Sequence, residues 1–259
     1  MTEPLVRPRR KNPLKRTRLP LRPQGVRSRT AHGLTAAAAE GRFALQVCLD
    51  CNTVIYPPRD ACPSCLSARL PFRDVARGGT LIAETTVRTT TDPYFRERTP
   101  WRVGTVKLDV GPVVVAHLHG DAVEGGRVRL ELKLDKSGSA VAIALPEKDT
   151  ENMADDPHLR EMTCDPKFRR VLITDGRTSV GQAMAKAFSD AGAAIVFVGL
   201  ADPWKPFPGM AGLRKIERVE IVPLDVTDSE SVTELAEQNG ARIDIVVNTA
   251  EHILSLIHI

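Results

Sequence analysis

The stretch CLDCNTVIYPPRDACPSC, residues 48–65, decides the fold of the first part of the chain. It holds two Cys-x-x-Cys pairs, Cys48 with Cys51 and Cys62 with Cys65, which are separated by ten residues. This spacing is typical of two thiolate hairpins that close over one tetrahedral zinc ion. Because four thiolates leave the metal no open position, the sequence predicts a structural zinc and not a catalytic one.

The residue after the first pair, Asn52, stands where such a hairpin needs a positive φ, and asparagine tolerates that backbone conformation. Two disulfides are the alternative interpretation. Nothing near the start of the sequence resembles a secretory signal, and a reducing cytoplasm would keep the thiols reduced, so we expect zinc and a cytoplasmic location. The fifth cysteine, Cys164, has no partner at metal spacing and is interpreted as an ordinary surface thiol.

Length and composition indicate a globular protein of two compact domains. The chain has 259 residues, of which 42% are hydrophobic and 26% charged. No apolar run approaches the 18 or more residues of a membrane span. The net charge is +4; the first 30 residues contribute +9, from ten Lys and Arg against one Glu, so the remainder carries −5. An acidic folded part disfavours nucleic acid as a partner.

The predicted organisation begins with a basic tail over residues 1–30, rich in Pro and Arg and expected to be disordered. A nucleic-acid arm, a transit peptide, a translated upstream region and a tail of no specific function remain open for it. The Ala-rich run at 30–42 predicts a short helix that ends at Gly41, and 43–48 predicts a strand. Residues 31–69 are thus expected to form a helix and the zinc ribbon.

Residues 70–147 predict an OB-fold, the small five-stranded barrel. Strand patterns near 79–90, 102–109, 112–118, 127–134 and 139–145 are separated by Gly, Asp and Pro turns. Three aromatic residues, Tyr94, Phe95 and Trp101, cluster before the second strand. They could stack on nucleic-acid bases, but with few basic neighbours they favour a plug at the barrel end or a contact with a partner.

Residues 31–147 resemble the zinc-ribbon and OB-fold proteins associated with acyl-CoA metabolism. The resemblance is carried by FALQVCLDCNTVIYPPRDACPSC, residues 43–65, the short helix before it, and a barrel that ends in ALPE. It implies a rubredoxin-like zinc ribbon joined to an OB-fold barrel, with a thiolase-like or hydratase partner and acyl-CoA thioesters handled by the complex. It implies no catalysis by the zinc.

Residues 148–168 are charged, lack a periodic pattern and predict an interdomain linker. Residues 169–253 then alternate apolar strands with amphipathic helices, which predicts a parallel, Rossmann-type sheet. This second region resembles the short-chain dehydrogenase/reductase family over residues 169–252. Because a complete member of that family is longer, the sheet is expected to be partial.

The resemblance implies NADP or NAD as a cofactor and places seven residues at its site. The glycine-rich turn of that family is altered, because Asp175 stands at the first glycine and Ser179 at the second. The acid that would bind the ribose of NAD falls at Gly199, and with Arg177 nearby this favours NADP. The cofactor-binding positions are Thr174, Gly176, Arg177, Gly181, Asp225, Val226 and Asn248.

No catalytic residue is assigned. The catalytic Ser and Tyr-x-x-x-Lys of the dehydrogenase family fall beyond residue 253, so we expect hydride transfer to be absent from the chain as given and the protein to continue further. The last six residues, LSLIHI at 254–259, resemble a translated sequencing adapter. A natural apolar tail is the alternative.

Three functions remain open at this point. The first is a fusion of an acyl-CoA-associated module, which recruits a thiolase-like partner or acyl-CoA, with an NAD(P)-dependent oxidoreductase domain. The second is a non-catalytic scaffold whose dehydrogenase-like half is degenerate, which Asp175 and Ser179 favour. The third, nucleic-acid binding by the ribbon, barrel and basic tail, is disfavoured by the acidic folded part.

Overall fold

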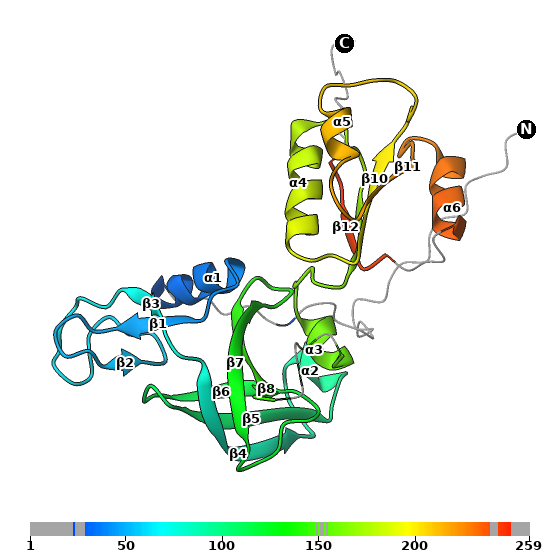
Figure 1. Ribbon diagram of the computed structural model, residues 1–259. Coiled ribbons are helices and arrows are strands. Elements are labelled where there is room, and N and C mark those ends of the chain that lie inside the picture. Colours follow the sequence, from blue (N-terminus) through cyan, green and yellow to red (C-terminus); the bar gives the residue numbers. More distant parts are fainter. Residues whose placement is uncertain are drawn as a thin grey trace, which may run out of the picture. The chain divides into compact units, whose positions relative to one another are not determined.

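The computed structural model describes residues 23, 29–148, 150, 153, 155–238 and 243–249 (Figure 1). The predicted basic tail, apart from a few positions, and the six terminal residues lie outside the described residues. The described chain divides into two compact units at Asp165 and Pro166. None of the helices in these ranges combines the length and apolar character that a bilayer crossing requires.

The first unit begins with a short 3-10 turn (Arg29–Ala31) and helix α1 (His32–Ala39), followed by a three-stranded antiparallel sheet. The sheet has the order β2-β1-β3, with β1 at Ala44–Val47, β2 at Val54–Ile55 and β3 at Phe72–Asp74. Helix α1 ends before Gly41, whose φ of 70° is easily adopted by glycine, as predicted. Strand β3 lies beyond residue 69, so the ribbon sheet extends into the segment that the sequence assigned to the barrel.

Five strands form a closed barrel in the order β4-β5-β6-β8-β7. They are β4 (Gly78–Val87), β5 (Trp101–Leu108), β6 (Val113–Leu118), β7 (Arg127–Leu134) and β8 (Ala140–Pro146). All pairs are antiparallel except β6 with β8. The five-stranded OB-fold barrel predicted from the strand pattern is therefore confirmed, with strand bounds within three residues of those expected. Alternate residues of each strand, such as Leu81, Val106 and Leu130, fill the barrel interior.

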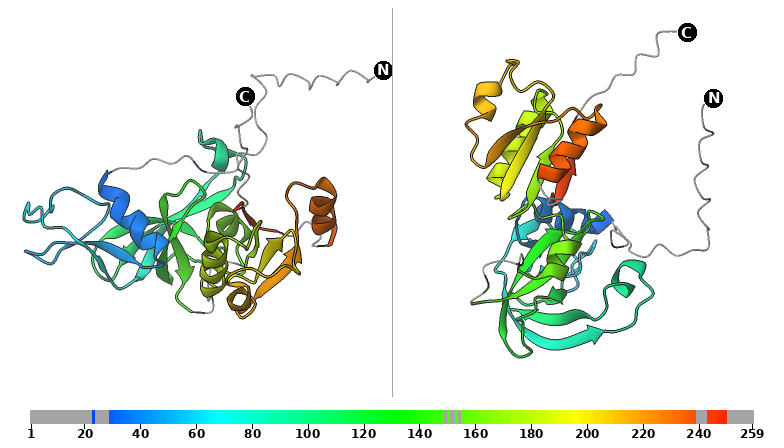
Figure 2. Two further views of the ribbon diagram at one scale, coloured as in Figure 1. Left: turned by 90° about the horizontal axis from the view of Figure 1, so that it is seen from above. Right: turned by 90° about the vertical axis from the view of Figure 1, so that its right-hand side faces the viewer.

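Helix α1 closes one side of this core. Its buried residues Leu34, Ala37 and Ala38 join the barrel interior, and the helix packs against β7 and β8. Leu45 of β1 belongs to the same cluster, so the ribbon sheet and the barrel share one hydrophobic core. Figure 2 shows α1 running beside the barrel strands. The helix predicted from the Ala-rich run thus connects the ribbon to the barrel.

The segment 148–168, expected to be a linker, contains helix α3 (Pro157–Met162). Its residues Leu159 and Met162, with Met153 before it, lie in a second core with Tyr94 of helix α2 (Pro93–Arg96). Asp156 caps α3 through hydrogen bonds from the backbone N–H groups of His158 and Leu159. This part of the segment therefore packs on the barrel, because its apolar residues are three positions apart on one helical face.

The second unit is a four-stranded parallel sheet in the order β11-β10-β9-β12. Its strands are β9 (Arg170–Ile173), β10 (Ile195–Leu200), β11 (Val219–Pro223) and β12 (Ile245–Val247). Helices α4 (Ser179–Asp190) and α5 (Met210–Leu213) cover one face, and α6 (Ser229–Gln238) covers the other (Figure 1). The alternation of strands and helices predicted for 169–253 produces this layered sheet.

Candidate functional site

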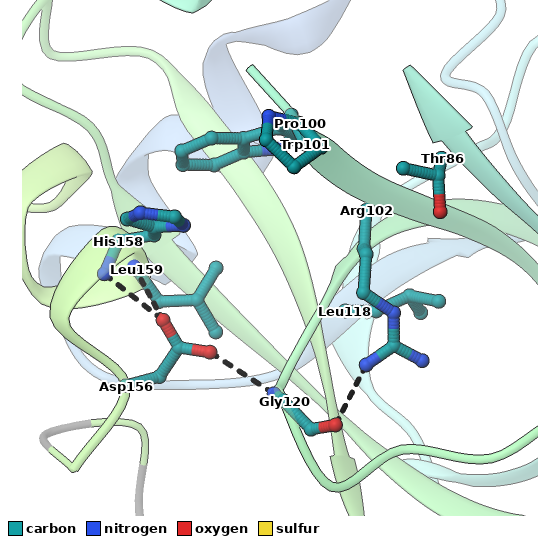
Figure 3. Close-up of a pocket in the computed structure, with 9 residues that line it drawn as sticks. All are labelled: Thr86, Pro100, Trp101, Arg102, Leu118, Gly120, Asp156, His158 and Leu159. Atoms are coloured by element: carbon teal, nitrogen blue, oxygen red, sulfur yellow. Dashed lines mark hydrogen bonds between the residues drawn. The ribbon is translucent and has the colours of Figure 1, made fainter. Parts of the chain in front are cut away.

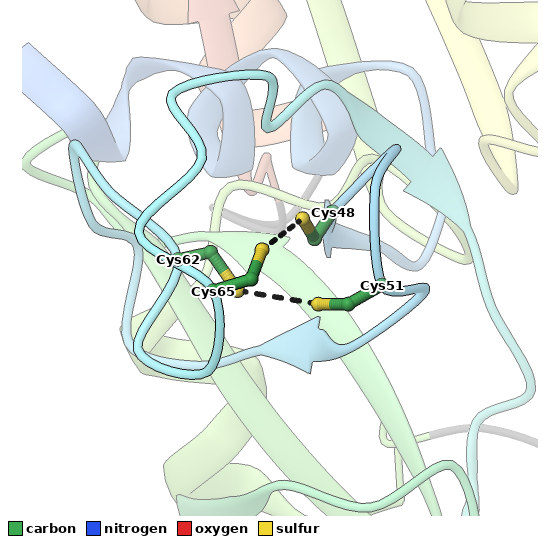
Figure 4. Close-up of side chains that lie close together, drawn as sticks. All are labelled: Cys48, Cys51, Cys62 and Cys65. Atoms are coloured by element: carbon green, nitrogen blue, oxygen red, sulfur yellow. Dashed lines mark hydrogen bonds between the residues drawn. The ribbon is translucent and has the colours of Figure 1, made fainter.

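The four predicted metal ligands lie together at the tips of the ribbon hairpins (Figure 4). The four Sγ atoms are all within 4.8 Å of one another. Cys48 and Cys65 are separated by 3.5 Å between their Sγ atoms, and Cys51 and Cys62 by the same distance. A tetrahedral zinc with Zn–S bonds of about 2.3 Å places its sulfurs about 3.8 Å apart. The cluster therefore fits a zinc ion, while a disulfide would need sulfurs at about 2.05 Å.

The two hairpins repeat one backbone pattern, which is why their sulfurs converge. In each hairpin the N–H of the first cysteine donates to the carbonyl five residues later, from Cys48 to Thr53 at 3.0 Å and from Cys62 to Ser67 at 2.8 Å. The residue after the second cysteine donates back to the carbonyl of the first, at 3.0 Å for Asn52 and 2.9 Å for Leu66. The repeated pattern places both pairs of sulfurs in the same way, and Cys48 and Cys62 also pack in a small core with Ile55 and Leu70.

This backbone pattern needs a left-handed residue after the second cysteine of each pair. Asn52 has a φ of 57°, as predicted, and Leu66 has a φ of 61°. Leucine at such a φ is strained, and its side chain is 80% exposed, so no burial compensates. The sequence analysis did not single out Leu66, although its place after Cys65 is equivalent to that of Asn52.

The four sulfurs share negative charge unevenly. A backbone hydrogen bond at Ser67 lowers the pKa of Cys65, but hydrogen bonding to the Cys48 and Cys51 sulfurs outweighs it and raises the pKa to about 12. The Thr53 hydroxyl lies 3.1 Å from Sγ of Cys51 and, as the main cause, lowers the pKa of Cys51 to about 6. The backbone N–H of Ser64 donates to Sγ of Cys62 at 3.4 Å. Four thiolates at this spacing would repel one another strongly, and a divalent cation removes that repulsion. Cys48 and Cys62 are fully buried, which makes the centre an integral part of the ribbon core.

The aromatic residues expected to plug the barrel end or contact a partner lie in the second core instead, against Ile143 and Leu145, which alternate along β8 with residues of the barrel interior. Tyr94 is 1% exposed and Trp101 is 3% exposed, and Phe95 packs edge-on against both. The indole Nε1–H of Trp101 donates to Nδ1 of His117 at 2.8 Å. Tyr94 and Trp101 are buried and Phe95 is partly buried, so this cluster is not an exposed stacking platform for bases.

A cavity of about 240 Å³ lies beside this aromatic cluster (Figure 3). Its apolar wall includes the Trp101 indole, on which the His158 ring stacks at 5.6 Å. The Arg102 guanidinium on its rim forms a bidentate ion pair with Glu84, at 2.9 and 2.7 Å, and donates to three carbonyl oxygens of the loop at 119–122. The Asp156 carboxylate accepts from the N–H of Gly120 and from the first turn of α3. These polar groups therefore connect β4, β5, the loop at 119–122 and α3 to one another.

A second group of side chains with metal-ligating atoms, His119, Asp121 and Asp155, lies near this cavity. His119 is buried, and its Nε2 lies 2.9 Å from a carboxylate oxygen of Asp155, while its Nδ1 accepts from the N–H of Asp121 at 3.2 Å. Both ring nitrogens thus have protein partners, and the hydrogen bonding of a neutral imidazole explains the arrangement. The sequence analysis did not identify this group.

In the second unit, the structure brings the residues expected at a dinucleotide site to the carboxyl edge of the sheet. The Thr174 hydroxyl at the end of β9 donates to Oδ1 of Asn248 at 2.8 Å and accepts from the N–H of Thr249 at 3.0 Å. A Cβ at Gly176 would lie 2.2 Å from Val198, and one at Gly181 would lie 2.2 Å from the Asp175 carbonyl oxygen. Glycine is therefore required where the turn passes β10 and where α4 begins.

The remaining predicted positions are engaged in local contacts. Oδ1 of Asp225 accepts from the backbone N–H and the hydroxyl of Thr227, at 2.9 and 2.5 Å, and Val226 is partly buried against the α6 face. Gly199 lies inside β10, where a Cβ would come within 2.7 Å of the Thr174 carbonyl oxygen, so an acidic side chain does not fit there. Asp202, two residues beyond the end of β10, pairs with Lys205 at 2.7 Å.

The guanidinium of Arg177 is already engaged, because it forms an ion pair with the Asp175 carboxylate at 3.1 Å. It is therefore not available to a cofactor phosphate in this arrangement. The hydrogen bond from Asp175 is the main cause that raises the pKa of Arg177, and the charges of Asp202 and Asp225 add to it. The turn between β9 and α4 therefore contains its own anion, which occupies donors that a pyrophosphate would use.

Comparison with known families supports the assignment of a zinc ribbon and an OB-fold to the first unit. A family model described as "ChsH2, rubredoxin-like zinc ribbon domain" matches residues 35–71, and one described as "ChsH2, C-terminal OB-fold domain" matches residues 72–133. The two matches are consecutive and cover the ribbon and most of the barrel. A zinc ribbon followed by an OB-fold, expected from the cysteine spacing and the strand pattern, agrees with both descriptions.

Curated relatives include uncharacterized oxidoreductases of Staphylococcus aureus strains USA300 and N315. Each is 32% identical over 87 residues, covering 32% of this chain and 37% of the relative. The chain thus spans little more than a third of the length of these relatives.

The solved structures that match include the following two. "Ltp2-ChsH2(DUF35) aldolase" has 24% identity, a TM-score of 0.42 and coverage of 48% of this chain and 98% of that one. The human synaptic vesicle membrane protein VAT-1 homolog-like protein has 13% identity, a TM-score of 0.22 and coverage of 69% and 62%. Both TM-scores are below 0.5, so neither structure bears on the fold.

Proposed function

We propose that residues 31–147 form an accessory module of an acyl-CoA enzyme complex, which recruits a thiolase-like partner or acyl-CoA. The observation that carries the proposal is a cluster of four thiols beside a closed five-stranded barrel, matched in that order by two consecutive family models. The family that this arrangement resembles works beside enzymes of acyl-CoA thioesters.

In this proposal the zinc holds the ribbon in shape and takes no part in a reaction. Four thiolates fill a tetrahedral coordination sphere, so the metal would have no position for water or a thioester oxygen. Its contribution would be to fix the two hairpins relative to β1, whose Leu45 belongs to the barrel core. The ribbon would then present its surface to a partner in one fixed orientation.

The second unit is proposed to be an oxidoreductase domain of the short-chain dehydrogenase type, with NADP or NAD as its cofactor. The strand order β11-β10-β9-β12 supports this, because it corresponds to the order 3-2-1-4 of a nucleotide-binding sheet. The glycines at 176 and 181 and the pairing of Thr174 with Asn248 also support it. The curated oxidoreductases are consistent with the same class.

A second candidate function is a scaffold whose dehydrogenase-like half has no redox role. The ion pair of Asp175 with Arg177 favours it, because a carboxylate stands where the phosphates of a dinucleotide would approach α4. A scaffold would keep the sheet for its shape and for contacts with other proteins.

Binding measurements test the accessory role, which both candidates share. The purified chain is titrated with a medium-chain acyl-CoA by calorimetry, and it is mixed with a thiolase-type enzyme from the same genome and analysed by gel filtration. The proposal predicts saturable binding of at least one of the two, and its loss on Cys51→Ser. Binding of neither would contradict the accessory role.

The redox role is measured separately by adding NADPH or NADH and recording nicotinamide fluorescence. A saturable change supports the oxidoreductase domain. An absence of change up to millimolar cofactor supports the scaffold.

A further inference from the structure

The turn between β9 and α4 is stabilised by a side chain that carries the charge a bound phosphate would bring. The Asp175 carboxylate directly follows Thr174, at the carboxyl end of the sheet. Its side chain is 13% exposed, so it is turned into the protein and not towards solvent. A buried carboxylate is costly unless hydrogen bonds and a cation compensate it, and here both are present.

The hydrogen bonds come from the turn itself. Oδ1 of Asp175 accepts from the backbone N–H of Arg177 at 2.8 Å and from its Nε at 3.1 Å. Oδ2 accepts from a terminal guanidinium nitrogen of Arg177, also at 3.1 Å. One residue therefore supplies a backbone donor and two side-chain donors to one carboxylate. Backbone N–H groups and an arginine are also the donors that bind phosphate at the start of a helix.

The backbone of Asp175 is held on two sides, so the carboxylate cannot leave by a simple shift of the turn. Its N–H donates to the Thr249 hydroxyl at 3.1 Å, and that hydroxyl donates to the Asp175 carbonyl at 2.8 Å. Gly181 of α4 packs so closely on the same carbonyl that a Cβ there would be 2.2 Å away. The turn is therefore fixed between β12 and α4 with its internal anion in place.

We propose that Asp175 sets the cofactor affinity of this turn: its carboxylate takes the donors of Arg177 that a dinucleotide pyrophosphate would need, and so weakens pyrophosphate binding. The inference rests on the proposed dehydrogenase-type sheet and names the group that limits its cofactor affinity. Removal of the carboxylate frees the backbone N–H and the guanidinium of Arg177 and removes one negative charge from the site.

The test compares NADPH binding by the whole chain and three variants, with inorganic pyrophosphate as a second probe. Asp175→Gly removes the side chain, and Asp175→Asn keeps its shape but removes its charge. Asp202→Asn is the matched control, because Asp202 also lies near Arg177 but pairs with Lys205 at 2.7 Å. Binding is followed by nicotinamide fluorescence and by calorimetry. Circular dichroism and thermal unfolding of each variant establish that the sheet is intact.

The proposal predicts that Asp175→Gly binds NADPH and pyrophosphate at least about tenfold more tightly than the wild type, equivalent to about 1.4 kcal/mol. Asp175→Asn should give a smaller gain, and Asp202→Asn a change below about twofold. Equal affinity of wild type and Asp175→Gly would overturn the inference while leaving the oxidoreductase domain in place. Binding by none of the folded proteins would overturn the inference and the oxidoreductase proposal together, and would leave the scaffold.

Discussion

If α3 packs on the barrel as the structure shows, truncation of its buried leucine should destabilise the first unit. Truncation of a residue in a solvated linker would not. Leu159 is 2% exposed and lies in the core that also contains Tyr94, Trp101 and Met162. Replacement of a buried leucine by alanine removes the transfer free energy of its methyl groups and leaves a cavity. We expect Leu159→Ala to lower the free energy of unfolding of the first unit by about 3 kcal/mol, within the range of about 2–5 kcal/mol typical of such sites.

The assay uses the two tryptophans, which lie in different units. Trp101 belongs to the barrel and stacks on His158 of α3, whereas Trp204 in the second unit is 74% exposed. In a Trp204→Phe background, fluorescence during urea unfolding reports the first unit alone. With a urea dependence of about 2 kcal/mol/M, the expected loss lowers the unfolding midpoint by about 1.5 M.

The matched control for Leu159→Ala is the truncation of an exposed side chain. Val123→Ala removes methyl groups from a side chain that is 68% exposed and should change the unfolding free energy by less than about 0.5 kcal/mol. A change of that small size for Leu159→Ala as well would mean that 157–162 is a solvated linker and that the packing described for α3 is incorrect.

Two further predictions concern the ribbon and the aromatic core that contains Trp101. Leu66→Gly should stabilise the ribbon by up to about 1 kcal/mol, because glycine adopts a φ of 61° without strain and the lost side chain is exposed; a lower urea midpoint than wild type would contradict this. Burial lowers the pKa of His117 to about 4, below its unfolded value of about 6.5. Burial of the neutral imidazole therefore contributes fully to the free energy of unfolding above pH 6.5, and this contribution is lost as the pH falls towards 4. Unfolding measured between pH 7 and pH 4 should show this loss, of about 3 kcal/mol. His117→Phe should flatten that part of the profile even though it leaves the Trp101 Nε1–H without its acceptor. An unchanged slope would refute the assignment.

The sequence predicted best those features that depend on residue spacing within a short segment. The spacing of Cys48, Cys51, Cys62 and Cys65 predicted the converging hairpins, and the position of Asn52 predicted its positive φ. Alternating apolar residues located the five barrel strands, because alternate side chains of a barrel strand must point inward. These features depend on short segments, which a single sequence describes well.

Other features depend on contacts between distant segments and were not predicted. Helix α3 was taken as linker because its charged neighbours hide the apolar pair Leu159 and Met162, although Asp156 followed by Pro157 is a recognisable helix start. The effect of Asp175 on a phosphate could not be decided from the sequence, since it depends on which way the carboxylate turns. The structure shows it bonded to Arg177, which also removes that arginine as a free 2′-phosphate ligand.

The metal content of the purified chain tests the central claim most directly. Elemental analysis together with thiol alkylation, with and without a chelator, should find one zinc per chain and four cysteines that become reactive only after the metal is removed. Cys51→Ser should lose the metal and lower the unfolding midpoint of the first unit. A chain without zinc, or one in which these four thiols are bridged or freely reactive from the start, would contradict the account of the ribbon and of the module built on it.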